Sequence, residues 1–202
     1  MLVPVFLLKS SAIKNIDREH FIERLGLLVI ILLGESIISI SYSLREIDFS
    51  QAVISNAFVG FLLIGAVWWI YFDSLPLLQE SHNDPKGYVL ILTHVFVCIG
   101  FGIVANTISH AILNNLITSE FRILLLIGLL LLYFGKQTPY FFTVLEYRRY
   151  ILLNSVSVFA IYSLSFFTES KFLILSLTTL PLFLYIALNY RAQRQLYGKV
   201  YL

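Results

Sequence analysis

The residues best suited to chemistry in this sequence are ionisable side chains inside long apolar segments. Glu35 stands deep in the first segment, Asp73 near the end of the second, and His94 near the start of the third. An ionisable side chain inside a membrane helix costs about 2.5–3.5 kcal/mol on insertion scales, so it is usually retained for a partner or a function. Glu35, Asp73 and His94 are therefore the first candidates for a substrate or ion pathway.

Three further candidates, His20, Glu23 and Arg24, lie at the start of the first segment. Side chains three or four residues apart are neighbours on a helix, so we expect one polar cap at the cytoplasmic interface. A structural ion pair and a functional site are equally compatible with this pattern. Glu35 follows Arg24 by eleven residues, about 16 Å of helix rise. That distance places Glu35 near mid-bilayer, out of reach of the cap.

The third segment repeats a polar or small residue at every fourth position: His94, Cys98, Gly102, Asn106 and His110. Residues four apart follow one ridge of a helix, so the pattern predicts a polar stripe. Asn106 and His110 fall near the outer end, where contact with water is the simpler explanation, and they are secondary candidates. Cys98 is expected to act as a small packing residue. As the only cysteine, it excludes an internal disulfide.

Depth along the helices indicates which of these residues can meet. Asp73 matches His94 in depth, and Glu35 lies opposite Cys98 and Gly102. A structural role is the alternative, because a buried carboxyl can be protonated and hydrogen-bonded. Such bonds between membrane helices contribute about 0.6–2 kcal/mol and can fix the register. We favour function for Glu35 and leave both roles open for Asp73 and His94.

The composition requires a membrane environment. Of the 202 residues, 58% are hydrophobic and 13% are charged, against about 45–50% and about 25% in soluble domains. Stretches of about 20 apolar residues are long enough to cross a bilayer as helices. We predict an all-α bundle of six transmembrane helices at 20–43, 52–77, 86–113, 121–135, 150–168 and 172–189. This domain, 20–189, lies between an interfacial or cytoplasmic segment, 1–19, and a cytoplasmic tail, 190–202.

Charge placement supports this division and orients the chain. The alternating loops put eleven of the 14 Lys and Arg residues on one side and only Arg45, Arg122 and Lys171 on the other. Basic residues concentrate on the cytoplasmic side of membrane proteins, so both termini are predicted to be cytoplasmic. The net charge of +2 and the dispersed basic residues argue against a nucleic-acid partner.

Motifs for cofactor chemistry are absent from the sequence. It has no glycine-rich phosphate loop, no HExxH or CxxC metal pattern, and no GxSxG nucleophile elbow. We therefore predict no cofactor and no metal, and an enzymatic function is less expected than a non-enzymatic one.

Three sequence blocks resemble a known family. The run HFIERLGL at 20–27, followed by LGES at 33–36, resembles the HxxERxGL…LGES signature of the bacterial low temperature requirement A (LtrA) family. WWIYFD at 68–73 resembles that family's WWxYFD segment, and the region of His94 with its following glycines is similar to the next block. The resemblance covers roughly residues 17–102 and is only hydropathic beyond Asn106.

The resemblance implies a multi-pass protein of the bacterial inner membrane that is linked to growth in the cold. It also implies a match to the C-terminal half of longer members, whose upstream half begins with an ELFFDLVFV-like helix. On that basis we expect either a truncated reading frame or a homodimer that replaces the missing half. A site at such an interface, near the midplane, suits Glu35.

Three functions remain open, in order of preference. The first is a transporter or channel with Glu35 as the titrating or ion-binding carboxylate and with Asp73 and His94 as a relay on the cytoplasmic side. The second is a non-catalytic protein that supports membrane or complex integrity in the cold. The third is a lipid-acting membrane enzyme with Glu23 and His20 as acid and base. The lipid bilayer is the expected partner in each case, and the substrate is unknown.

Overall fold

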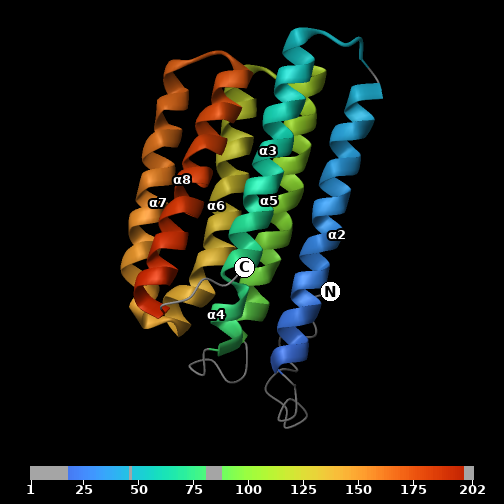
Figure 1. Cartoon of the computed structure of the whole chain (residues 1–202). Coiled ribbons are helices and arrows are strands. Elements are labelled where there is room, and N and C mark those ends of the chain that lie inside the picture. The colour runs from blue at the N-terminus through green and yellow to red at the C-terminus, as the bar shows by residue number, and fades with distance from the viewer. Residues whose placement is uncertain (1–17, 46, 81–87, 198–202) are drawn as a thin grey trace.

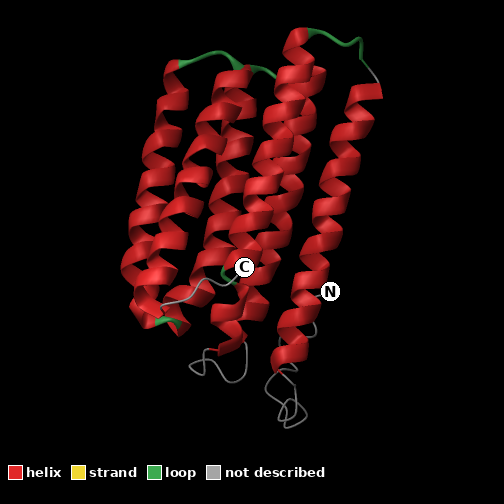
Figure 2. Cartoon of the chain, in the orientation of Figure 1, coloured by secondary structure: helices red, strands yellow, loops and turns green. Residues whose placement is uncertain are grey.

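The computed structural model describes residues 18–45, 47–80 and 88–197. The predicted segment 1–19 and tail 190–202 lie partly outside these residues. The described part is a bundle of long helices (Figure 1), and Figure 2 shows no strand in it. Its elements are α2 (Arg18–Arg45), α3 (Gln51–Asp73), α4 (Leu75–Glu80), α5 (Tyr88–Leu113), α6 (Thr118–Thr143), η2 (Leu145–Tyr147), α7 (Arg148–Ser163), η3 (Leu164–Phe167) and α8 (Lys171–Tyr197).

Six helical segments in the described part are long and apolar enough to cross a membrane, which confirms the predicted all-α fold. The second of them contains α3 and the first part of α4, and the fifth contains η2, α7 and η3. Helix α2 begins and helix α8 ends at the same end of the bundle (Figure 1), which we name the terminal end. The loops after α2, α5 and α7 lie at the opposite end. That the terminal end faces the cytoplasm remains a prediction.

The fourth span is longer than predicted. The sequence predicts a helix at 121–135 and a loop from Lys136, whereas α6 continues to Thr143. Lys136 and Gln137 are tolerated inside the bundle because both have a polar partner there. The ammonium of Lys136 donates to the Tyr185 hydroxyl at 2.8 Å, and the Gln137 amide donates to the same oxygen at 3.1 Å.

Helices α5 and α6 pack at backbone contact, because glycine is present where they cross. A Cβ added at Gly100 would lie 2.7 Å from the amide nitrogen of Leu132 and 2.9 Å from the carbonyl oxygen of Gly128. Gly135 meets the backbone of Thr93 in the same way, at 2.6 Å. Small residues of this kind let membrane helices approach closely, so α5 and α6 form the tightest pair in the bundle.

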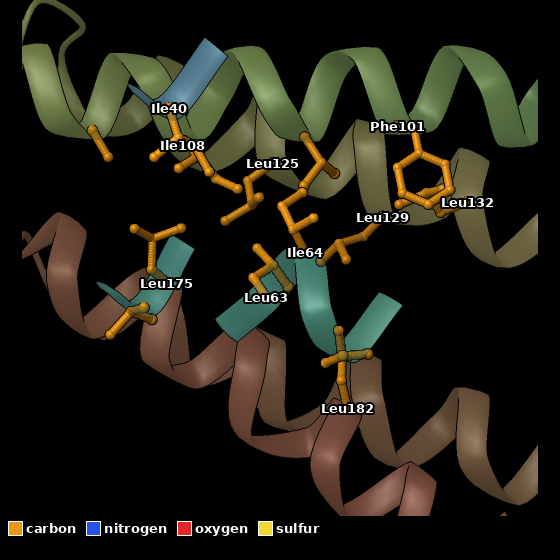
Figure 3. Close-up of a cluster of buried hydrophobic side chains, with 14 of the residues drawn as sticks. Ile40, Leu63, Ile64, Phe101, Ile108, Leu125, Leu129, Leu132, Leu175 and Leu182 are labelled. Atoms are coloured by element: carbon orange, nitrogen blue, oxygen red, sulfur yellow. The ribbon is translucent and has the colours of Figure 1, made fainter. Parts of the chain in front are cut away.

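An apolar core fills the bundle from its middle toward the opposite end. Figure 3 shows side chains from α3, α5, α6 and α8 meeting there, among them Leu63, Phe101, Ile108, Leu129 and Leu175. Each of these five is at most 1% exposed. The half of the bundle nearer the opposite end is therefore closed by hydrocarbon side chains.

The outer surface of the bundle is also apolar. Helices α2 and α7 lie at its two edges (Figure 1), and α2 packs mainly on α5 and α3. The remaining face of α2 carries exposed aliphatic side chains such as Ile31 and Ile38, at 67% and 61% exposure. An apolar surface this extensive is compatible with lipid rather than water as the surrounding solvent.

Candidate functional site

The carboxyl group of Asp73 is the centre of a buried polar network near the terminal end. Asp73 is 6% exposed. Its Oδ2 accepts hydrogen bonds from the side-chain amides of Asn189 and Gln193 on α8, the latter at 3.1 Å. The Tyr147 hydroxyl donates to Oδ1 of Asn189. The network thus joins α3, η2 and α8, and it leaves Oδ1 of Asp73 without a hydrogen bond from the described residues.

A break in the second span positions Asp73. Helix α3 ends at Asp73, and Ser74 begins a tighter turn in which Leu77 donates its backbone N–H to the Ser74 carbonyl at 3.1 Å. The carbonyl of Asp73 therefore accepts instead from the side-chain amide of Gln193, at 3.2 Å. The backbone carbonyl and the side-chain carboxylate of Asp73 therefore both accept from the side-chain amide of Gln193.

Positive charge lies one helical turn deeper. The ammonium of Lys136 is 4.8 Å from the ring centre of Tyr140 and 5.1 Å from that of Tyr185, so two aromatic faces shield it. Lys136 is also close enough to Asp73 for an electrostatic interaction. A carboxylate and an ammonium group are thus held near each other inside the bundle by separate sets of hydrogen bonds.

His94 pairs with Tyr71 rather than with Asp73. The Tyr71 hydroxyl and Nε2 of His94 are 2.7 Å apart, and the rings meet edge-on with their centres 5.7 Å apart. Residues 71 and 73 differ by about 200° around a helix, so their side chains face different neighbours. His94 lies at the depth of this part of α3, as its position in the sequence indicates, but its partner is Tyr71, two residues before Asp73.

Two spaces adjoin these groups. A groove with a volume of about 460 Å³ runs between α3 and α8 and reaches Asp73; its lining is Trp69, Asp73, Phe183, Ile186, Ala187, Tyr190, Arg191 and Arg194. A smaller cavity of about 30 Å³ lies on the inner side, where Tyr71, Lys136 and Gln137 meet apolar side chains. Within the described residues, no three His, Cys, Asp or Glu side chains are grouped for a metal ion.

Comparison with known proteins places the chain in a family. The family described as "Bacterial low temperature requirement A protein (LtrA)" matches residues 1–189. The chain belongs to the LtrA family. No curated protein and no solved structure matches it. The resemblance inferred from residues 17–102 is thereby confirmed, and the match extends through Asn189 in the network of Asp73.

Glu35 lies apart from this site in the LtrA chain. It is on the exposed face of α2, beside Gly34 and between Ile31 and Ile38 along the helix, and it makes no hydrogen bond or ion pair with the described residues. Its neighbour Ser36 is buried and donates to the Leu32 carbonyl at 2.7 Å. The structure therefore does not bring Glu35 together with Asp73 and His94.

The predicted cap is present but exposed. Nδ1 of His20 lies 3.5 Å from Oε2 of Glu23, and the two side chains are 73% and 65% exposed. Arg24 is exposed beside them. This geometry matches the predicted cluster, which lies on the outer surface of α2 rather than in the network of Asp73.

The secondary candidates lie on the rest of α5. Nδ1 of His110 is 2.6 Å from Oδ1 of Asn115, in the loop at the opposite end, and Asn106 is exposed. Cys98 is a half-buried free thiol. The ridge from His94 to His110 thus passes from the interior of the bundle to its surface.

Sequence reasoning missed the groups that hold Asp73, although a signal for some of them exists. Tyr185, Asn189 and Gln193 recur at every fourth position of α8. The same spacing drew attention to the ridge that begins at His94. Tyr147 carries no such pattern, because it comes from the short turn η2 rather than from a long helix.

Proposed function

We propose that this LtrA-family protein transports a proton or a small cation across the membrane, with Asp73 as the binding carboxylate. The observation that carries the proposal is the geometry of Asp73. Its Oδ2 is fixed by two amide donors, while Oδ1 has no described hydrogen-bond partner beside a groove that opens at the surface. Intramembrane carboxylates with this kind of access commonly mark ion pathways.

Asp73 is a better candidate than Glu35 for a route through this bundle. A pathway past Glu35 would follow the exposed face of α2, whereas Asp73 lies among α3, η2 and α8. Lys136 adds a second reason, because its ammonium interacts electrostatically with the carboxylate but forms no ion pair with it in the described structure, which leaves Asp73 open to an arriving cation. We infer that Lys136 balances Asp73 when no cation is bound.

The closed core favours a carrier over an open channel. Leu63, Phe101 and Leu129 are buried in the path from Asp73 to the opposite end. An ion leaving in that direction therefore needs the helices to separate first. Alternating access, in which one group of helices moves against another around a fixed site, satisfies this requirement.

A structural role is the second candidate, because the hydrogen bonds of Asp73 run between α3 and α8. Buried polar groups of this sort can fix helix register without any transport. The two functions differ in what a conservative substitution does. Asp73→Asn keeps the size of the side chain and an oxygen acceptor, but it removes the negative charge.

The test is flux in proteoliposomes that contain a pH-sensitive dye and carry an imposed membrane potential. We expect Asp73→Asn to reduce flux to the level of empty liposomes while its thermal midpoint stays near that of the wild type. Glu35→Gln is the matched control at the other intramembrane carboxylate, and it should retain flux. Normal flux in Asp73→Asn would refute the role of Asp73. If Asp73→Asn loses stability and the folded wild type shows no flux, the structural role is favoured.

A further inference from the structure

The groove between α3 and α8 is lined by apolar side chains in its deeper part and by basic side chains at its mouth. Its deeper part is formed by Phe183, Ile186 and Trp69, and its mouth, nearer the terminal end, carries Arg191 and Arg194. From Phe183 to Arg194 helix α8 rises by about 16 Å. The groove therefore offers an apolar wall followed by a basic rim, aligned with the axis of the bundle.

The two arginines at the rim have no partner within the described residues. Both are exposed, and neither makes a hydrogen bond, an ion pair or a stacking contact there. They are three residues apart, so their side chains project from the same face of α8. Guanidinium groups bind phosphate oxygens through paired N–H donors, and two in this arrangement can hold one phosphate group from both sides.

Aromatic side chains mark the level of the rim as the membrane interface. Tyr190, next to Arg191, and Trp69, about one helical turn deeper, line the groove and are 44% and 42% exposed. Trp and Tyr concentrate where hydrocarbon meets lipid headgroups. A phosphate bound by Arg191 and Arg194 would consequently lie at headgroup depth, with hydrocarbon below it.

We propose that the α3–α8 groove is a binding site for an anionic phospholipid. Its phosphate lies between Arg191 and Arg194, and the first part of one acyl chain follows Phe183 and Ile186. This site goes beyond the proposed function, because it does not require transport. Basic pockets beside membrane helices are known to hold anionic headgroups.

Charge in the groove favours an anionic lipid over a zwitterionic one. Two guanidinium groups face one carboxylate, that of Asp73, which leaves an excess of positive charge. A zwitterionic lipid brings no net charge to neutralise it. Asp73 lies at the depth of the rim, because its carboxylate accepts from Asn189 and Gln193 on either side of Arg191. The carboxylate repels phosphate, so the phosphate lies on the outer side of the two guanidinium groups, away from Asp73. Free phosphate does not fit as the main occupant, because it has no apolar part that could contact the apolar wall of the groove.

The experiment measures which lipid stays with the purified protein. Full-length protein is exchanged into equal amounts of phosphatidylglycerol and phosphatidylethanolamine, and the retained lipids are quantified by native mass spectrometry. We expect enrichment of phosphatidylglycerol in the wild type and its loss in Arg191→Ala/Arg194→Ala. Arg149→Ala is the matched control, because Arg149 is an exposed arginine at the terminal end outside the groove. It should keep the enrichment.

Ala187→Trp provides a second variant in case the double substitution fails to fold. Ala187 lines the groove, so an indole there fills the path of the acyl chain while both arginines remain, and enrichment should fall. Equal retention of the two lipids, equal loss in Arg149→Ala, or displacement by free glycerol phosphate would overturn the proposal. Asp73→Asn should abolish flux and raise the enrichment, because it removes the carboxylate that repels the phosphate; these opposite effects separate this site from the transport function.

Discussion

Replacing Gly135 with alanine tests whether α5 and α6 are held at backbone contact. A Cβ at this position would lie 2.6 Å from the carbonyl oxygen of Thr93 and 2.7 Å from the amide nitrogen of Val97. Ordinary van der Waals contact begins at 3.4 Å. Both neighbours are backbone atoms of α5, so only a separation of the two helices relieves the overlap.

The magnitude follows from two opposing effects. Overpacking of a close contact costs about 1–3 kcal/mol, while alanine gains about 1 kcal/mol over glycine in helix propensity. Separation of the helices at Gly135 also loosens the contacts at Gly100 and Gly128 on the same interface. The difference of these two effects is about 0–2 kcal/mol, and because three close contacts loosen together we expect a net loss in the upper half of that range in the free energy of unfolding.

The assay is unfolding in mixed micelles, followed by tryptophan fluorescence against the mole fraction of sodium dodecyl sulfate. Gly102→Ala is the control, because a Cβ at Gly102 of α5 would meet no atom within 4 Å. It should unfold at the wild-type midpoint or above it. If Gly135→Ala proves as stable as Gly102→Ala, the close packing of α5 and α6 is refuted.

Three other substitutions have defined outcomes in the same unfolding assay. Tyr147→Phe removes the donor to Asn189 and should destabilise the protein by about 0.6–1.7 kcal/mol; an unchanged midpoint would contradict the hydrogen bond. Arg122→Gln removes a bond of 2.6 Å to the Thr168 carbonyl from a side chain that is largely buried, and should cost about 1–3 kcal/mol. Retention of phosphatidylglycerol should not change in that variant, because Arg122 is at the opposite end. Glu35→Leu should raise stability, since it removes an exposed carboxyl group that costs about 2.5–3.5 kcal/mol on insertion scales. A fall in stability would instead mean that another protein surface covers Glu35.

The sequence predicts depth in the membrane well, because hydrophobic length and charge position depend only on distance along the chain. His94 does lie level with this part of α3, but it contacts Tyr71, two residues before Asp73. The direction in which a side chain faces depends on how the helices pack, and apolar segments without a clear polar face do not reveal it. Glu35 and Asp73 look alike in the sequence, yet one is exposed on α2 and the other is 6% exposed in the bundle.

The end of the fourth span shows a different difficulty. Lys136 and Gln137 resemble the start of a loop because polar residues usually leave the hydrocarbon region. Their partner, Tyr185, is 48 or 49 residues away on α8, and only the fold brings it near. A polar residue inside a membrane helix can be predicted only when its partner is found, and long-range partners are not visible in one sequence.

The interruption between α3 and α4 has an electrostatic consequence for Asp73. The carbonyl groups at the last turn of a helix carry a partial negative charge equivalent to about half an elementary charge. Because α3 ends at Asp73, this partial charge lies beside its carboxylate. A cation at Asp73 would thus be attracted by the helix macrodipole as well, by about 0.3–2 kcal/mol. An unbroken second span would lack this attraction even with every side chain in place.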